Sequence, residues 1–204
     1  MIADSDIPAE TVRAFAAHMA EEYGARIVLR GSDLVGAAVD TGLRAIGLDP
    51  SRYATTVGRT IYVPEPIGAD HATWNRWGQI VTITHECQHI HQHDTTGLVA
   101  HALRYARAAG RTMLEADAYA TEMELARWRY GTVEQWWIDW RPRALGAYLV
   151  SEADIATMRR VLLSRAPTVR RGGVVTHAGR TAIGWLDEHA PELRAPGVAS
   201  RAPS

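Results

Sequence analysis

The spacing of apolar residues along the chain predicts a mostly helical protein with a few short strands near its N-terminal end. Apolar positions recur at helical intervals from Pro8, which suits a first helical turn and has Asp6 as its capping residue, to a stop at Gly24. The β-branched run Arg26–Arg30 predicts a strand. A second helix is expected over residues 33–46.

A hairpin is expected next. Tyr53–Val57 and Thr60–Val63 alternate in polarity, and Gly58 lies between them. Pro64 and Pro66 follow directly, and neither can donate a hydrogen bond to a neighbouring strand. The sequence therefore predicts that Thr60–Val63 lies at the edge of a sheet.

Helices are predicted for most of the remaining chain. The first begins near Asp70 and contains Gly78, which costs about 1 kcal/mol relative to alanine and indicates a kink or a tight packing contact. Two later starts, at Thr132 and Ser151, carry capping-box signals. The later helices are expected over Leu98–Ala108, Thr112–Tyr130, Thr132–Trp140, Ser151–Ser164 and Thr176–His189. The expected fold class is α+β, mostly helical, with a small antiparallel or mixed sheet on the N-terminal side.

Length and composition are those of a soluble globular protein. The chain has 204 residues, of which 47% are hydrophobic and 22% charged. We expect a single domain over residues 1–190 and a flexible tail, rich in proline, alanine and serine, over residues 191–204. The formal net charge of −1, with arginines scattered along the chain, argues against nucleic-acid binding.

Three features of the sequence predict a cytoplasmic protein. Cys87 is the single cysteine, so the chain cannot form an internal disulfide and fits a reducing compartment. The first ten residues lack the basic and apolar regions of a signal peptide. No stretch approaches the roughly 20 apolar residues that span a bilayer, so no membrane association is expected.

Residues 85–89 read HECQH, a pattern typical of catalytic zinc sites. His85 and His89 lie one turn apart on the same helical face, so both imidazoles can reach one zinc ion at about 2.0–2.1 Å. Glu86 borders the open coordination position, where it can take a proton from water and later deliver it to a leaving amine. The motif therefore predicts Zn²⁺ as cofactor and Glu86 as general base.

The histidines that follow the motif do not complete this site. His93 shares a face with His85 and His89, but it lies two turns from His85, roughly 12 Å along the helix axis. That separation exceeds the reach of two imidazoles on one zinc ion. We therefore interpret His91 and His93 as a polar helix end.

A glutamate on a later helix can complete a His₂Glu site, because its carboxylate can approach the first helix from the side. Glu115 is the preferred third ligand, and Glu122 and Glu124 are the alternatives. The predicted metal ligands are therefore His85, His89 and Glu115.

The combination of HECQH with a helix reading EADAYA from Glu115 resembles the gluzincin metallopeptidases, particularly the compact minigluzincin-type proteins. The resemblance covers about Thr60–Arg129, roughly a third of the chain. It implies a zincin-like fold, zinc ligation by Glu115, and a peptide or protein substrate. It also implies that an extended substrate pairs with the Thr60–Val63 strand.

The chain departs from the family pattern four residues after Glu115. Many gluzincins carry an aspartate there that orients a zinc-binding histidine, whereas this chain has Tyr119. The nearest aspartate is Asp117. A hydrogen-bond partner for each zinc-binding histidine is physically expected, so the departure leaves the role of Asp117 open.

Several other residues have a functional and a structural interpretation. Tyr62, Tyr105 and Tyr119 could each donate a hydrogen bond to a developing oxyanion, but a packed ring with a satisfied hydroxyl is favoured for each. Cys87 points away from the metal and is expected to be a small buried residue. A cluster of tryptophans is expected to pack into the core rather than bind a partner; it comprises Trp128, Trp136, Trp137 and Trp140.

The favoured function is a zinc metallopeptidase that hydrolyses a peptide bond with a zinc-activated water. The alternative is a non-catalytic protein, for example a phage-encoded assembly or interaction protein, in which zinc holds the helices together. Glu86 favours the enzyme, because a purely structural zinc site has no use for a base. A third hypothesis is a metal-free binding module in which the histidines are incidental.

Overall fold

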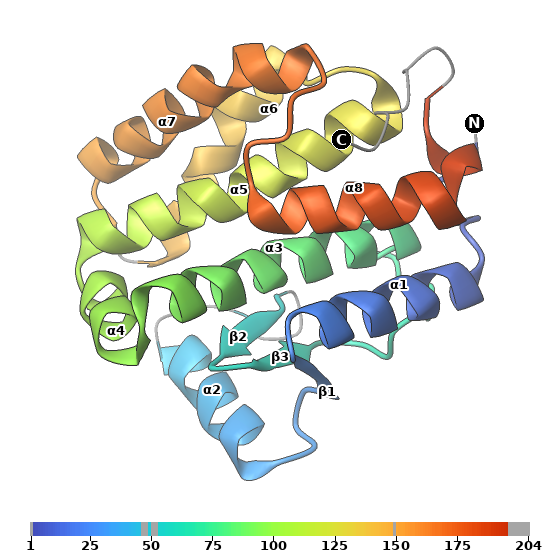
Figure 1. The fold of residues 1–204 in the computed structure, drawn as a ribbon. Helices are drawn as coiled ribbons and strands as arrows, with labels where there is room; N and C mark the ends of the chain where they lie inside the picture. Colours follow the sequence, from blue (N-terminus) through green and yellow to red (C-terminus); the bar gives the residue numbers. More distant parts are fainter. Residues whose placement is uncertain (1, 46–48, 50–52, 149, 196–204) are drawn as a thin grey trace.

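The computed structural model describes residues 2–45, 49, 53–148 and 150–195, and within them one small sheet lies at one end of a mostly helical molecule (Figure 1). This arrangement confirms the α+β class, with helices dominating. The end expected for the second helix, at residue 46, lies outside the described residues.

The described helices lie close to the predicted ranges. None of them is long and apolar enough to cross a membrane. In chain order they are α1 (Ala9–Glu22), α2 (Leu34–Ala45), α3 (Arg76–Thr96), α4 (Leu98–Ala106), α5 (Ala108–Tyr130), α6 (Gln135–Trp140), α7 (Glu152–Arg170) and α8 (His177–His189), with 3₁₀ helices η2 (Arg141–Tyr148) and η3 (Pro191–Leu193).

The sheet is mixed and has the strand order β1-β3-β2, where β1 is Arg26–Leu29, β2 is Thr55–Val57 and β3 is Thr60–Val63. β1 pairs with β3 in parallel, with Arg26 opposite Thr60, and β2 pairs with β3 as the predicted hairpin. The expectation that Thr60–Val63 is an edge strand is therefore wrong. β3 is central because β1 occupies its other side, and β2 is the edge strand that contacts α3.

Helix α3 runs through the middle of the molecule, with the sheet and α1 on one side and α5 on the other (Figure 1). It begins at Arg76 rather than near Asp70. The Asn75 side chain caps it by accepting a hydrogen bond of 2.7 Å from the Gly78 amide. Gly78 thus lies in the first turn, and a Cβ at this position would lie 3.1 Å from Oδ1 of Asn75, which is the tight packing contact that the sequence offered as one reason for a glycine here.

The helix caps differ in part from prediction. The capping box of Ser151 and Asp154 is present at the start of α7. At α6 the N-cap residue is Glu134 and its side chain makes no capping hydrogen bond, so the capping box expected from Thr132 is wrong. Asp6 does not cap α1 either, because Pro8 occupies the N-cap position.

Helix α7 continues past its expected end at Ser164 to Arg170, although Pro167 lies inside it. Proline removes one helical hydrogen bond, and this cost has to be offset by packing. Ala166 and Val169, on either side of the proline, are buried in the hydrophobic cluster between α5 and α7. Tertiary burial therefore decides where this helix ends.

The core consists of two clusters of buried apolar side chains, and α5 contributes to both. The first lies between α1, α3, α8 and the sheet, and includes Phe15, Ile83 and Leu186. The second includes Met123 of α5 and Leu162 of α7. Cys87 is fully buried in the first cluster, as expected.

The C-terminal segment is packed further than expected. Leu193 is fully buried, and its carbonyl accepts a hydrogen bond from the Arg129 guanidinium, which also pairs with Asp4 at 3.1 Å. The expected flexible tail, residues 191–204, therefore does not include Pro191–Leu193, which form η3. The part of that tail over residues 196–204 lies outside the described residues.

The tryptophans do not form one buried cluster. Trp128 is buried, and its indole donates a hydrogen bond of 2.8 Å to Asp187. Trp137 is partly buried against the second cluster. Trp136 and Trp140 are 63% and 56% exposed, so the expectation of core packing is wrong for these two residues.

Candidate metal centre

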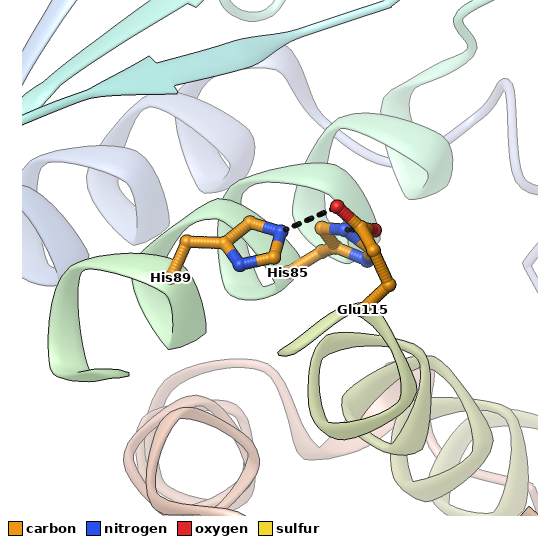
Figure 2. Close-up of side chains that lie close together, drawn as sticks. All are labelled: His85, His89 and Glu115. Atoms are coloured by element: carbon orange, nitrogen blue, oxygen red, sulfur yellow. Dashed lines mark ion pairs between the residues drawn. The ribbon is translucent and has the colours of Figure 1, made fainter. Parts of the chain in front are cut away.

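Helices α3 and α5 bring the three predicted metal ligands together. His85 and His89 are one turn apart on α3, and their ring centroids are 5.0 Å apart. Glu115 projects from α5, and Figure 2 shows its carboxylate facing both imidazoles. Its oxygens lie 3.5 Å from Nε2 of His85 and 3.6 Å from Nε2 of His89.

The donor set fits a metal ion. One ligand atom from each of the three residues can be chosen so that all lie within 4.8 Å of one another. The three side chains are close to fully buried, with exposed fractions of 11%, 13% and 7%. Two imidazoles and one carboxylate are the protein ligands of a familiar type of catalytic zinc site, in which a further position stays open.

Each histidine is oriented by a second partner. Nδ1 of His85 lies 3.0 Å from Oε1 of Glu122, and Nδ1 of His89 lies 2.9 Å from Oε1 of Gln92. A carboxylate or amide oxygen accepts a hydrogen bond from Nδ1–H, which leaves Nε2, the nitrogen that faces Glu115, as the one that can bind a metal ion. The tautomer needed for metal binding at Nε2 is therefore favoured at both rings.

Glu122 is itself held in place by Arg141, from the start of η2. The Arg141 guanidinium donates to both carboxylate oxygens of Glu122, at 3.0 Å and 2.9 Å, and lies over the Tyr119 ring at 4.5 Å. Burial raises the pKa of Glu122, but Arg141 and His85 lower it more, to below its usual value. Glu122 is thus an ionised partner of His85 rather than part of the ligand group.

The electrostatics of the metal-free site favour a cation between the helices. Burial lowers the pKa of His85, but the Glu115 and Glu122 carboxylates on either side of the ring raise it to about 10. Burial raises the pKa of Glu115, but His89 and His85 lower it more, to below its usual value. Arg141 already supplies positive charge to Glu122, so it is the buried Glu115 carboxylate whose charge a proton on a histidine or a metal ion can balance.

Glu86 shares a cavity with this group. Its side chain is buried, and Oε2 accepts a hydrogen bond of 2.6 Å from the hydroxyl of Thr56 on β2. The cavity has a volume of about 570 Å³ and is lined by the three ligands, Glu86 and the whole of β2. The Glu86 carboxylate, the group of His85, His89 and Glu115, and the edge strand β2 thus border the same cavity.

The three candidate tyrosines have different positions. Tyr105 and Tyr119 line the cavity, and burial raises the pKa of both phenols, so both stay protonated. Tyr119 packs edge-on against His85, with ring centroids 5.1 Å apart. Tyr62 is not among the residues that line the cavity. It is buried and its hydroxyl donates a hydrogen bond of 3.4 Å to Asp33, which confirms the expected packed ring with a satisfied hydroxyl.

Two acidic residues considered from the sequence lie outside the ligand group. Glu124 accepts hydrogen bonds from the Val175 and Thr176 amides at the start of α8. Asp117 forms an ion pair with Arg165 and accepts a 3.4 Å hydrogen bond from the same Gln92 side chain that contacts His89. Asp117 therefore supports a histidine only through Gln92.

Sequence reasoning missed Gln92, Arg141 and Thr56, and it named Glu122 only as an alternative ligand, not as the partner of His85. Gln92 follows His89 by three residues, and Glu122 follows Glu115 by seven, so both spacings place them on the ligand face of their helices. These periodicities were a usable signal. Arg141 and Thr56 come from other elements, and no local spacing indicates them.

No protein-family model, curated protein or solved structure matches this chain. The resemblance to gluzincins therefore remains a prediction from the motif.

Proposed function

We propose that this protein is a zinc-dependent hydrolase that cleaves a peptide bond in a peptide or protein substrate. The observation that carries the proposal is the position of Glu86, whose carboxylate lies in the same cavity as the His85, His89 and Glu115 group. A structural zinc site has no use for such a group or for an open cavity beside it.

Each residue has a role in this proposal. His85, His89 and Glu115 would hold the ion, which would supply a Lewis acid to polarise a carbonyl and acidify water. Glu86 accepts the proton from water and passes it to the leaving amine. The Thr56 hydroxyl fixes the Glu86 carboxylate by a 2.6 Å hydrogen bond, so the base is held in one orientation.

The edge strand supports a peptide as the substrate. Within the described sheet β2 pairs only with β3, and Thr55, Thr56 and Val57 line the cavity. An extended peptide can add to a free strand edge through main-chain hydrogen bonds. In this proposal β2 is the strand that pairs with the substrate, in place of β3, for which the resemblance to gluzincins implied that role.

The test is Glu86→Gln, which keeps the shape of the side chain and removes its basicity. We expect hydrolysis of a mixed peptide library, read by mass spectrometry, to fall at least about 100-fold while zinc content stays unchanged. The matched control is Glu134→Gln, at an exposed glutamate on the N-cap of α6. Cleavage by Glu86→Gln at the wild-type rate would contradict the proposal.

A further inference from the structure

A second pair of histidines lines the cavity beside the metal centre. His93 lies one turn after His89 on α3, and His101 comes from α4. Their ring centroids are 5.6 Å apart and the ring planes meet at 72°. The ligand pair His85 and His89 has nearly the same arrangement, at 5.0 Å and 77°.

Both rings carry a buried nitrogen that is not satisfied. Nε2 of His93 and Nδ1 of His101 are inaccessible to solvent, and neither has a hydrogen-bond partner among the described residues. An unpaired buried polar atom costs about 1–3 kcal/mol, so such atoms are rare without a reason. Two of them on neighbouring rings in one cavity point to a shared ligand.

The chemistry of the pair specifies the kind of ligand. Two imidazoles bound to one tetrahedral zinc ion at about 2.0–2.1 Å place their ring centres roughly 5 Å apart, close to the separation seen here. Neutral imidazole nitrogens favour transition-metal ions such as Zn²⁺ over Mg²⁺ or Ca²⁺, which prefer oxygen ligands.

The His93 ring is oriented for this role. Its Nδ1 lies 3.3 Å from a carboxylate oxygen of Asp94, and Asp94 is held by the Arg59 guanidinium at 2.9 Å. A carboxylate at Nδ1 stabilises the tautomer with a free lone pair on Nε2, as Glu122 does for His85 at the first site. His101 stacks on Tyr105 with the ring planes at 21°, which positions the second ring.

We propose that His93 and His101 form a second binding site for a divalent transition-metal cation such as Zn²⁺. No carboxylate joins this pair in the described ligand groups, so the second ion binds more weakly than the ion at His85, His89 and Glu115. The proposal does not depend on the hydrolase activity, since it rests on the two rings and their unpaired nitrogens.

The experiment is a titration of the metal-stripped full chain with Zn²⁺ in competition with a chromophoric chelator. We expect the wild type to bind two ions in separate steps. His93→Ala and His101→Ala each lose the weaker step and keep the tighter one. Glu115→Ala does the reverse, so failure of the second site and failure of the first are distinguishable.

The control is His189→Ala, at an exposed histidine on α8, and it should keep both steps. Far-ultraviolet circular dichroism of each variant establishes that it is folded. A wild type that binds only one ion overturns the proposal. So does a weaker step that survives in both His93→Ala and His101→Ala.

Discussion

At the residue scale, His85 is the most constrained side chain of the centre. It has Glu115 at Nε2, Glu122 at Nδ1 and the Tyr119 ring against its edge. The Arg141 guanidinium in turn holds Glu122. Metal affinity should therefore depend on residues that do not touch the ion.

Glu122→Ala removes the partner of His85 without removing a ligand. We expect it to lower zinc affinity about 10- to 100-fold, because the ring loses its fixed orientation and part of its basicity. Competition with a chromophoric chelator measures the change. Glu134→Ala, at an exposed glutamate, is the control and should leave the affinity unchanged. Equal affinities for Glu122→Ala and the wild type would refute a role of Glu122 in positioning His85.

The grouping of His85, His89 and Glu115 could be predicted from the sequence because the relation between the two histidines is local, although both relations to Glu115 join different helices. A spacing of four residues fixes two imidazoles on one helical face, and a second helix need only supply a carboxylate. The choice of Glu115 over Glu122 depends on how α3 and α5 are shifted along each other. Residue spacing within one helix does not contain this information. Arg141 was beyond prediction, since it reaches the site from a different helix.

At the element scale, α8 is fixed to α5 through its N-terminus. The Glu124 carboxylate of α5 accepts hydrogen bonds from the Val175 and Thr176 amides, and Gly179 lies directly beside it. A Cβ built on Gly179 would lie 1.8 Å from Oε2 of Glu124 and 2.6 Å from the Thr176 hydroxyl. Glycine at this position is therefore required by packing.

Gly179→Ala should destabilise the protein by at least about 1–3 kcal/mol, because the new methyl group displaces the Glu124 carboxylate and the hydroxyl of Thr176, the N-cap residue of α8. Gly184→Ala in the same helix is the matched control, since nothing lies within 4 Å of its Cβ. It should stabilise by up to about 1 kcal/mol through helix propensity. Urea denaturation measures both changes. If Gly179→Ala were as stable as Gly184→Ala, this account of the α5–α8 junction would be wrong.

The strands show which features of the sheet the local sequence pattern predicts and which it does not. The hairpin of β2 and β3 was predictable because Gly58 and the polarity pattern are local signals. The position of the two strands in the sheet was not predictable, because β2 becomes the edge strand only when β1 pairs in parallel with β3. The prolines after β3 suggested an edge, but they lie beyond its end at Val63 and remove no hydrogen bond from the strand.

At the scale of the whole molecule, the three candidate ligands come from helices that build both clusters of the core. α3 belongs to the first cluster of buried side chains, and α5 contributes to both. An ion held by His85, His89 and Glu115 would tie these helices together. Metal binding should therefore stabilise the entire fold and not only the cavity.

Removal of metal should lower the melting temperature. Zinc at 100 times its dissociation constant stabilises a native protein by about 2.7 kcal/mol, which corresponds to a shift of roughly 5–10 °C for a chain of this size. Scanning calorimetry with and without EDTA measures the shift. Glu115→Ala should show a smaller one. A wild type with the same melting temperature in both conditions would argue against a metal that spans α3 and α5.

Zinc binding by His85, His89 and Glu115 is tested most directly by elemental analysis of protein purified without added metal. Wild type, Glu115→Ala and the control Glu134→Ala are purified side by side. We expect about one tightly held zinc ion per chain in the wild type and the control, and a clear loss of zinc in Glu115→Ala. Absence of zinc from all three, or an unchanged content in Glu115→Ala, would contradict it.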